Sequence, residues 1–386
     1  LGASAYNFGQ TTAGQQNGYT IASLPNKSLK WQSTSQFNFG LDFGFWKNRL
    51  SGSIEIYNQK TKDILLPVSL PISNGADRTI QNLGKTKASG FELTINSVNI
   101  RNKSLTWTTD FNFYLNREKI VELTTPSQIN DIGNGWFVGQ PITVIYDYKK
   151  LGIWQTGEHG LTTQTSPVQK AGDIKLEDVN GDNKITADDR QIIGNFQPKF
   201  ETGMTNTVSF KGFDLGISLY ARIGMKVVVP YLSSEPGGSF FAGYNWFLTG
   251  RNNQLKVDYW TPRNPTNKFP QPDALAPPQY NSVLSYVDGS FVKCRAINLG
   301  YNVPAKLLSR VNVSTLRVYV SFVNPFVIWS PFVKEGYGPD PEGNGFGGSV
   351  AAQGGGGQAG TVGRQITVNA NNPATRQIIF GVNLNF

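Results

Sequence analysis

The sequence predicts an all-β chain that forms a segment of a transmembrane antiparallel β-barrel with long extracellular loops. Apolar and polar residues alternate over stretches of ~10 residues or more, whereas strands of soluble sandwiches more often have about 5–6. The apolar positions are rich in Phe and Leu, and the connections between the stretches are strongly unequal in length. Long strands with one apolar face, short turns at one rim and long loops at the other are typical of such barrels.

Segment 36–46, with the sequence QFNFGLDFGFW, shows the alternation most clearly. Its five apolar residues fall on one face of a strand and its small or polar residues on the other, because successive side chains point to opposite faces. The same pattern recurs at 91–96, 105–115, 203–210, 213–222, 316–322 and 380–386. Segment 291–301 is less regular, and a shift of its phase near Ala296 indicates a β-bulge.

The lengths of the connections divide them between two rims. The short turns are 47–48, 100–104, 211–212 and 304–314, the last with a helical turn, and the long connections are 61–87, 225–289 and 324–374. The nine strands from 36–46 to 375–386 then alternate in direction without contradiction, and a first strand near Leu1 gives about ten, an even number. The stretch 117–199 must begin and end at the long-loop rim, so it contains either no spanning strand or two.

Composition excludes several classes of function. Charged residues make up 16% of the 386 residues, against about 25% in an average soluble domain. The net charge is +9, but Lys and Arg are scattered without a basic run, so no nucleic-acid partner is expected. Cys294 and His159 are the only residues of their types, which excludes an internal disulfide, a Cys-based zinc site and any His pair. We therefore expect no enzyme activity.

The stretch DVNGDNKITADD, residues 178–189, has the spacing of a calcium-binding loop. On an EF-hand template, side-chain oxygens occupy the first, third, fifth, ninth and twelfth positions, and the seventh position offers its backbone carbonyl. The candidate ligands are Asp178, Asn180, Asp182, Lys184, Thr186 and Asp189. Two departures are Asn183 in place of the usual Gly, and Asp189, whose arm is shorter than that of Glu. The alternative is a surface turn whose Asx side chains hydrogen-bond its own backbone.

Four aromatic residues in the long connection 225–289 are candidates for contact with a substrate or partner: Tyr244, Trp246, Trp260 and Tyr280. Such rings stack on sugars or anchor protein partners. The alternative for each of them is that it packs the large loop on itself.

Several segments together resemble one known family. The stretch from GDIKLEDVNGDNKITADDRQIIGNF to DLGISL, at 172–219, resembles the most recognisable segment of the SusC/RagA-type TonB-linked outer-membrane transporters of the Bacteroidota. The stretches LPNKSLKW, VGQPITVIYDYKKLGIW, DYWTPRNPTNKFP, FVKCRAINLGYNVP and NPATRQIIFGVNLNF occur in the order found in that family. The resemblance covers nearly the whole chain.

The resemblance implies that residues 1–386 are the C-terminal part of a barrel of about 22 strands, with the earlier strands and an N-terminal plug outside this sequence. It implies import of oligosaccharides, glycans or peptides across the bacterial outer membrane. The implied partners are a SusD-like surface lipoprotein, the TonB complex, the remainder of the barrel and the lipopolysaccharide-containing membrane. Residues 155–199 are then an extracellular loop that carries the calcium motif, and Ca²⁺ has a structural role.

Two alternatives stay open on the residues. A passive porin-like channel has the same architecture without coupling to TonB. A soluble calcium-binding carbohydrate-recognition protein built from sandwiches also has alternating strands, but it dissolves in water without detergent.

Overall fold

The computed structural model describes residues 6–7, 17–18, 23–70, 73, 75–76, 78–125, 127–132, 135–158, 160–163, 168–233, 258–271, 278–308, 313–342, 345–347, 365–368 and 375–385. Its main feature is a nine-stranded antiparallel sheet with the order β26-β23-β22-β19-β18-β9-β8-β5-β4. The nine strands are β4 (Ser33–Phe45), β5 (Leu50–Lys62), β8 (Lys85–Arg101), β9 (Leu105–Glu122), β18 (Phe200–Phe210), β19 (Phe213–Ile223), β22 (Phe291–Asn302), β23 (Thr315–Trp329) and β26 (Gln377–Asn385). The nine alternating strands predicted from the sequence are confirmed.

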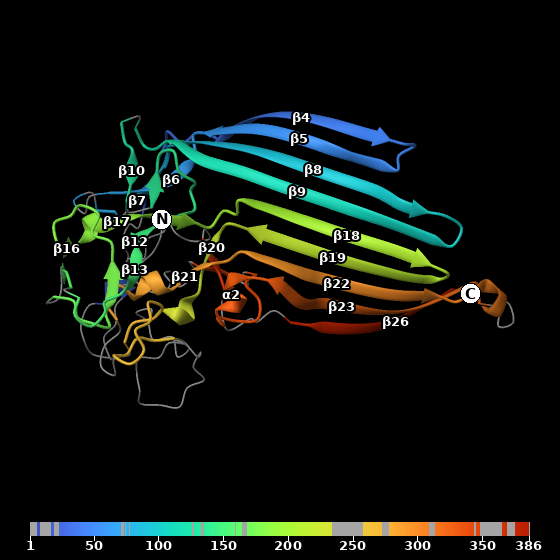
Figure 1. Cartoon of the computed structure of the whole chain (residues 1–386). Helices are drawn as coiled ribbons and strands as arrows, with labels where there is room; N and C mark the ends of the chain where they lie inside the picture. Colours follow the sequence, from blue (N-terminus) through green and yellow to red (C-terminus); the bar gives the residue numbers. More distant parts are fainter. Residues whose placement is uncertain are drawn as a thin grey trace.

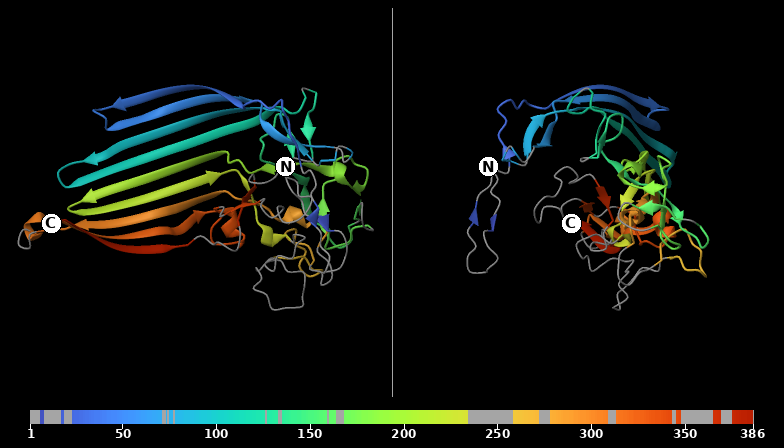
Figure 2. Two further views of the ribbon diagram at one scale, coloured as in Figure 1. Left: turned by 180° about the vertical axis from the view of Figure 1, so that it is seen from behind. Right: turned by 90° about the vertical axis from the view of Figure 1, so that its left-hand side faces the viewer.

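The sheet is long and curved, with its short turns at one end and its long connections at the other (Figures 1 and 2). We call these the turn end and the loop end. At the turn end, Lys211 and Gly212 both have positive φ, 47° and 89°, as required by a type I′ turn whose twist suits a two-residue hairpin. The predicted helical turn at this end is α1 (Ala305–Leu308).

The two faces of the sheet differ as the alternation predicts. One face carries exposed apolar side chains, among them Phe37 (70% exposed) and Phe380 (80% exposed). We call it the outer face, and the opposite, largely polar face the concave face, because the sheet curves around it in the end-on view of Figure 2. Contact of so many Phe and Leu side chains with water is unfavourable, whereas the hydrocarbon of a membrane suits such a face.

Two irregularities shape the last strands. The register of β22 against β19 and β23 shifts between Cys294 and Ala296, which confirms the predicted bulge. The prediction that a long loop begins at Asn324 is wrong: Asn324 adopts φ 50°, and β23 continues beyond it to Trp329. A bulge absorbs one extra residue without ending a strand.

Asn206 is an amide side chain on the largely apolar outer face of β18. Asn206 lies between Met204 and Val208, and its Oδ1 accepts hydrogen bonds from Trp107 Nε1 at 3.0 Å and from Thr109 Oγ1 at 2.7 Å. These two bonds satisfy the amide oxygen where water is scarce.

The long connections pack together at the loop end into what we call the loop assembly (Figure 1). Its core is formed by buried residues from distant segments, including Ile153, Ile185, Val227, Trp260 and Phe332. Its strands are β10 (Asn130–Asp131), β11 (Trp136–Phe137), β12 (Val144–Tyr148), β13 (Lys150–Ile153), β14 (Thr162–Thr163), β15 (Ile174–Leu176), β16 (Lys184–Ile185), β17 (Arg190–Asn195), β20 (Lys226–Val228), β21 (Tyr286–Asp288), β24 (Gly345–Gly347) and β25 (Gln365–Thr367). The described residues between 117 and 199 thus contribute no spanning strand beyond β9.

The remaining elements are short. They are the strands β1 (Tyr6–Asn7), β2 (Asn17–Gly18), β3 (Ser23–Leu24), β6 (Leu65–Ser69) and β7 (Arg78–Asn82), the helix α2 (Pro331–Lys334), and the 3₁₀ turns η2 (Ala187–Asp189), η3 (Pro230–Leu232) and η4 (Asn281–Leu284). Among the described residues, no helix has the length and apolar character needed to cross a membrane.

Candidate functional site: the concave wall and the loop assembly

The concave face carries a network of charged and aromatic side chains near the loop end. On β18 and β19, the Tyr220 hydroxyl donates a hydrogen bond to the Glu201 carboxylate, and Arg222 Nη2 lies 3.4 Å from Glu201 Oε2. The guanidinium of Arg295, on β22, lies 3.9 Å from the centre of the Tyr220 ring. At this distance a cation is attracted by the electrons of the ring face. The network therefore presents both charge signs and an aromatic ring on one stretch of the concave face. We call the concave face of the nine-stranded sheet the wall.

Lys293 joins this wall to a segment of the loop assembly. Its side chain is 2% exposed, and its Nζ lies 2.8 Å from Asp340 Oδ2 and 2.5 Å from Glu342 Oε2. Glu342 also forms an ion pair with Arg295, whose Nη2 lies 2.5 Å from Glu342 Oε1. A buried ammonium needs such partners, because its desolvation is otherwise unfavourable by several kcal/mol. The ion pairs therefore fix the 339–342 segment against β22.

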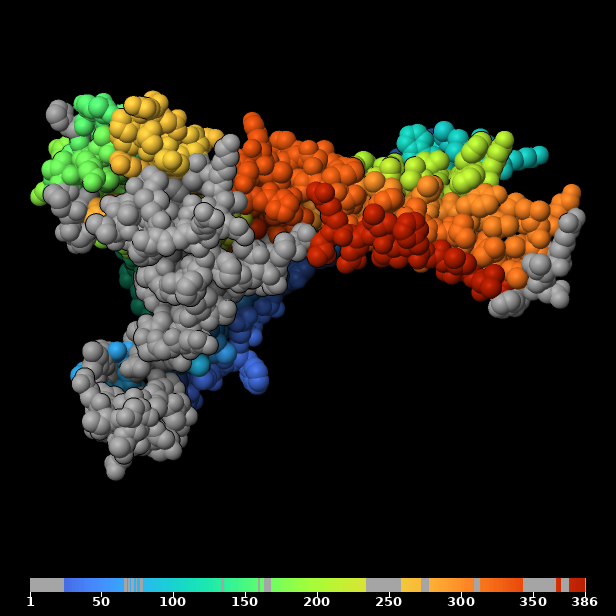
Figure 3. Space-filling view, turned by 90° about the horizontal axis from the view of Figure 1, so that it is seen from below, coloured from blue at the N-terminus to red at the C-terminus, as the bar shows by residue number. Residues whose placement is uncertain are grey.

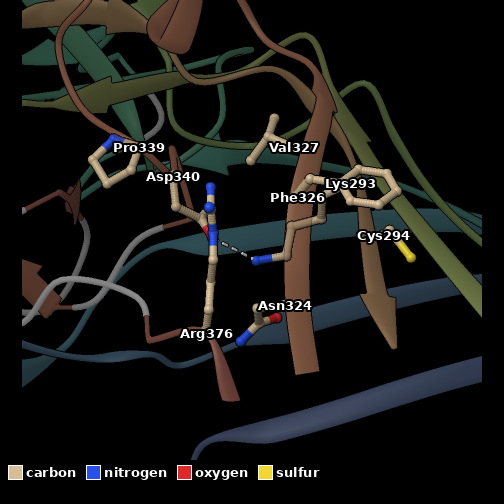
Figure 4. A pocket seen from close by; sticks show the side chains of 8 residues that line it. All are labelled: Lys293, Cys294, Asn324, Phe326, Val327, Pro339, Asp340 and Arg376. Carbon is tan, nitrogen blue, oxygen red and sulfur yellow. Dashed lines mark hydrogen bonds and ion pairs between the residues drawn. The ribbon is translucent and has the colours of Figure 1, made fainter. Parts of the chain in front are cut away.

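A small cavity of about 20 Å³ lies beside Lys293, lined by Cys294, Asn324, Phe326, Val327, Pro339, Asp340 and Arg376. Figure 4 shows Arg376, just before β26, extending alongside Asp340, with Lys293 on the other side. A polar cavity of this size holds about one water molecule. It is a packing feature of the wall and is too small for a cargo molecule.

Further along the wall, two tyrosines meet across β8. The Tyr57 hydroxyl lies 3.3 Å from the Tyr114 hydroxyl and donates to Asn116 Oδ1 at 3.2 Å. Tyr57 can lean across β8 because that strand has Gly90 at the crossing point, where a Cβ atom would lie 2.2 Å from the Tyr57 ring. Sequence reasoning assigned Gly90 no role, since a Gly in a strand acquires one only when its neighbours are known.

The predicted calcium loop has a well-defined backbone held by its own side chains. Asp178 accepts the backbone N–H of Gly181 at 2.7 Å and of Asn183 at 2.8 Å, and Asn183 adopts the positive φ of 61° that the template requires at this position. Asp189 is fully buried and accepts the N–H of Val179 and of Thr186 at 2.9 and 2.7 Å.

The remaining candidate ligands lie in the same turn. Asn180 Oδ1 accepts the N–H of Asp182 at 3.0 Å, and Asp182 Oδ1 accepts the N–H of Lys184 at 2.8 Å. Within the described ranges no three acidic, His or Cys side chains form a metal-binding group. A cation here would also have to draw on amide and carbonyl oxygens, which keep a second lone pair when they accept one hydrogen bond. The donor set is all oxygen, as Ca²⁺ prefers, and binding stays a prediction.

The two described members of the aromatic set belong to the core of the loop assembly. Trp260 is 3% exposed, and its Nε1 donates to Gln155 Oε1 at 2.9 Å. Tyr280 is half-buried and packs edge-on against Tyr148, with ring centres 4.8 Å apart. Both therefore pack the loop on itself, and contact with a cargo or partner stays a prediction for them. Tyr244 and Trp246 lie outside the described residues, as does His159.

Sequence reasoning missed the ion pairs of the wall. Lys293 lies in the one strand whose alternation was irregular, and that irregularity is the bulge that precedes Ala296. Asp340 and Glu342 lie far along the chain in a loop without periodicity. The only signal was a charged residue inside a strand pattern, which does not identify its partner.

Comparison with known proteins agrees with this architecture. The model of the family described as "TonB dependent receptor-like, beta-barrel" matches residues 2–163. TonB-dependent receptor P3 of Formosa agariphila is 32% identical over 342 residues, which cover 86% of this chain and 32% of that protein. The chain belongs to the TonB-dependent receptors.

Further similarities extend the assignment of this TonB-dependent receptor. TonB-dependent receptor SusC of Bacteroides thetaiotaomicron is 28% identical over 361 residues, which cover 87% of this chain and 33% of that protein. The structure of the RagAB peptide transporter matches all of this chain and 38% of that chain, with a TM-score of 0.66 at 23% identity, and so shows the same fold. The resemblance to SusC/RagA-type transporters of the outer membrane is confirmed. The receptor chain spans about a third of the length of the curated relatives it matches.

Proposed function

We propose that this TonB-dependent receptor imports oligosaccharides, glycans or peptides across the outer membrane with energy from the TonB complex. The observation that carries the proposal is the concave wall, where Glu201, Tyr220, Arg222 and Arg295 present hydrogen-bonding groups, both charge signs and a ring face together. A polar cargo needs such groups to replace water along its path. Family membership supports the coupling to TonB, and the similarity to RagAB, described as a peptide transporter, supports peptides as one class of cargo.

The loop assembly is, in this proposal, the extracellular side of the transporter, including residues 155–199. A SusD-like lipoprotein docks on it and delivers the cargo. The transporter moves cargo without making or breaking bonds in it. The remainder of the barrel pairs with the outer edges of β4 and β26, which have no neighbouring strand among the described residues, because unpaired backbone N–H and C=O groups are unfavourable by several kcal/mol each in hydrocarbon.

We also propose that Ca²⁺ binds the 178–189 loop in a structural role. The backbone carries the required turn at Asn183, and Ile185, within the loop, is fully buried in the core of the loop assembly. Residues Asp178, Asn180, Asp182, Thr186 and Asp189 would supply side-chain oxygens, and Lys184 its carbonyl. A cation there would stabilise the loop close to the point where Ile185 packs into the core of the loop assembly.

Uptake in the native bacterium tests the transport function. Cells with the complete gene product should accumulate labelled peptide or oligosaccharide, and deletion of the gene or of tonB should abolish accumulation. The double variant Tyr220→Phe/Arg295→Gln should lower uptake severalfold while leaving the amount of protein in the outer membrane unchanged. Uptake that persists without TonB would instead support the passive channel. Recovery of the protein only as a detergent-free soluble monomer would support the carbohydrate-recognition alternative, which the exposed outer face disfavours.

A further inference from the structure

Three lysines form a row across neighbouring strands at the loop end of the sheet. Lys60 of β5 pairs with Lys87 of β8, and Lys87 pairs with Lys119 of β9. Directly paired residues of antiparallel strands have Cβ atoms about 4.5–5.5 Å apart, and like charges at such positions destabilise the sheet. None of the three forms an ion pair within the part of the chain that the structure describes. The repulsion in this row is therefore left for something outside the described chain to neutralise.

The row lies on the outer face, above the apolar band. Four residues away from the lysine on each strand are Ile56, Phe91 and Leu115, which are also paired with one another. Because four is an even number of residues, they lie on the same face as the lysines. At about 3.3 Å per residue, the lysine row lies ~13 Å from this apolar row along the strands. Between the two rows, Asn58, Ser89 and Arg117 form a polar row. The order from the loop end is thus cationic, polar and apolar.

A groove with a volume of about 580 Å³ adjoins the row. Four of the residues that line it carry positive charge, Lys87, Arg117, Lys119 and Lys199, and one is acidic, Glu118. The guanidinium of Arg117 is held in place by the carbonyls of Lys199 at 2.6 Å and of Pro198 at 3.3 Å. These bonds leave the charge of Arg117 uncompensated by any carboxylate in the described chain, so the groove attracts anions.

We propose that this row and groove bind the phosphorylated headgroup of a lipopolysaccharide molecule in the outer leaflet. The ligand must be an anionic amphiphile, because phosphates match the Lys and Arg side chains and acyl chains match the outer face around Phe91 and Leu115. A soluble anionic cargo fits less well, since the site lies on the face opposite the transport wall. The inference rests on the proposed orientation, in which the loop end is extracellular.

Lipid analysis of the complete transporter tests the site. The protein is extracted from outer membranes in mild detergent, washed, and the retained lipids are identified and quantified by mass spectrometry. In the triple variant Lys60→Gln/Lys87→Gln/Lys119→Gln, the retained lipopolysaccharide should fall at least fivefold. The matched control Lys47→Gln/Lys103→Gln/Lys211→Gln removes the same charge from the turn end of the sheet and should retain the wild-type amount. Circular dichroism, and the difference in electrophoretic mobility between unheated and heated samples, establish that both variants form barrels.

Each other result overturns the proposal. Equal retention in both triple variants excludes the row as the binding site. Retention of glycerophospholipid in place of lipopolysaccharide shows that the loop end faces the periplasm, which contradicts the orientation without affecting TonB-dependent uptake. Loss of peptide or oligosaccharide binding in the lysine variant, with lipopolysaccharide unchanged, assigns the groove to cargo. Because retention is measured in purified protein, it does not depend on whether the transport assay succeeds.

Discussion

The Arg317 guanidinium on β23 reaches the Asp214 carboxylate on β19 across the intervening strand β22, with Nη2 2.6 Å from Oδ2 and Nε 3.2 Å from Oδ1. Gly300 of β22 lies beneath this bidentate pair, and a Cβ atom there would be 2.5 Å from Arg317 Nη2 and 2.6 Å from Asp214 Oδ1. The pair links two strands that share no backbone hydrogen bond, so its energy adds to the stability of the wall.

Gly300→Ala should displace the Asp214–Arg317 pair and lower the free energy of unfolding by about 0.5–1.5 kcal/mol, as expected for a half-exposed bidentate ion pair. Asp214→Asn should have a similar effect, and the double variant should be little worse than either single one, because both remove the same contact. Urea unfolding of the barrel in detergent measures these values. Gly216→Ala is the control, since its Cβ would meet Asn298 only at 3.9 Å. Additive losses in the double variant would show that Gly300 acts independently of the pair.

Lys293→Met should release the 339–342 segment from the wall. The substitution leaves Asp340, which is largely buried, without its ammonium, and breaking a buried pair in this way costs about 3–5 kcal/mol. Hydrogen exchange of a peptide covering 331–342 should accelerate, while exchange in β5 and β8 stays unchanged. Adding Asp340→Asn and Glu342→Gln should recover part of the loss. Lys334→Met, at an exposed position of the same segment, is the control, and equal acceleration in it would contradict the assigned role of Lys293.

Asp178→Ala tests the calcium loop. Wild-type protein should bind one Ca²⁺ with a dissociation constant on the order of 10⁻⁴–10⁻³ M, as extracellular modules do, and the variant should bind none. Equilibrium dialysis with elemental analysis gives the stoichiometry. Asp188→Ala removes a neighbouring exposed carboxylate outside the ligand set and should bind as wild type does. If the wild-type protein binds no Ca²⁺, the loop is a turn held by its Asx hydrogen bonds.

The loop assembly should become more stable as the pH rises above about 8. Burial lowers the pKa of Lys150 from 10.5 to about 8, and its amine donates to the carbonyl of Lys268. Between pH 8 and 10.5 the unfolded chain binds more protons at this site than the folded chain, so the free energy of unfolding rises with pH. Below pH 8 both states carry the proton, and the folded state bears the full unfavourable effect of the buried charge.

Lys150→Met should remove this rise and stabilise the loop assembly at pH 7. One pKa unit corresponds to about 1.4 kcal/mol, so the lowering from 10.5 to about 8 amounts to ~3–4 kcal/mol. Hydrogen exchange of β13 and β15 between pH 7 and 10, corrected for intrinsic rates, measures the difference between wild type and variant. Lys170→Met, at an exposed position, is the control. A wild-type profile parallel to that of Lys150→Met would contradict the assignment.

The strands were predictable because each follows from a local pattern. Alternation placed Phe37 and Phe39 on one face without knowledge of the neighbouring strands, and the lengths of the turns gave the directions. The loop assembly was not predictable in this way, since its core joins Ile153 and Ile185 from one connection with Val227 and Phe332 from two others. Pairing between distant short segments, such as β12 with β17, leaves no periodicity in the sequence.

The candidate site likewise has features that the sequence predicted and features that depend on tertiary contacts. The turn at Asn183 was foreseen, because a template specifies each position of the loop. The burial of Trp260 and the partners of Lys293 depend on contacts that only the folded chain brings together. Asn206 is an exception to the alternation. This polar side chain lies on an apolar face because Trp107 and Thr109 donate hydrogen bonds to it.

The segment from α2 to Glu342 is fixed at both ends, and this has a mechanical consequence. Phe332 is fully buried in the core of the loop assembly, whereas Asp340 and Glu342 are fixed to the strand wall through Lys293. Figure 3 shows the orange atoms of this part of the chain joining the loop assembly to the long strands. Only a few residues separate the two attachment points, so little slack exists between them. A force that moves the loop assembly away from the sheet must therefore also pull on β22. A mechanical force applied at the loop end would in this way be transmitted to the long strands.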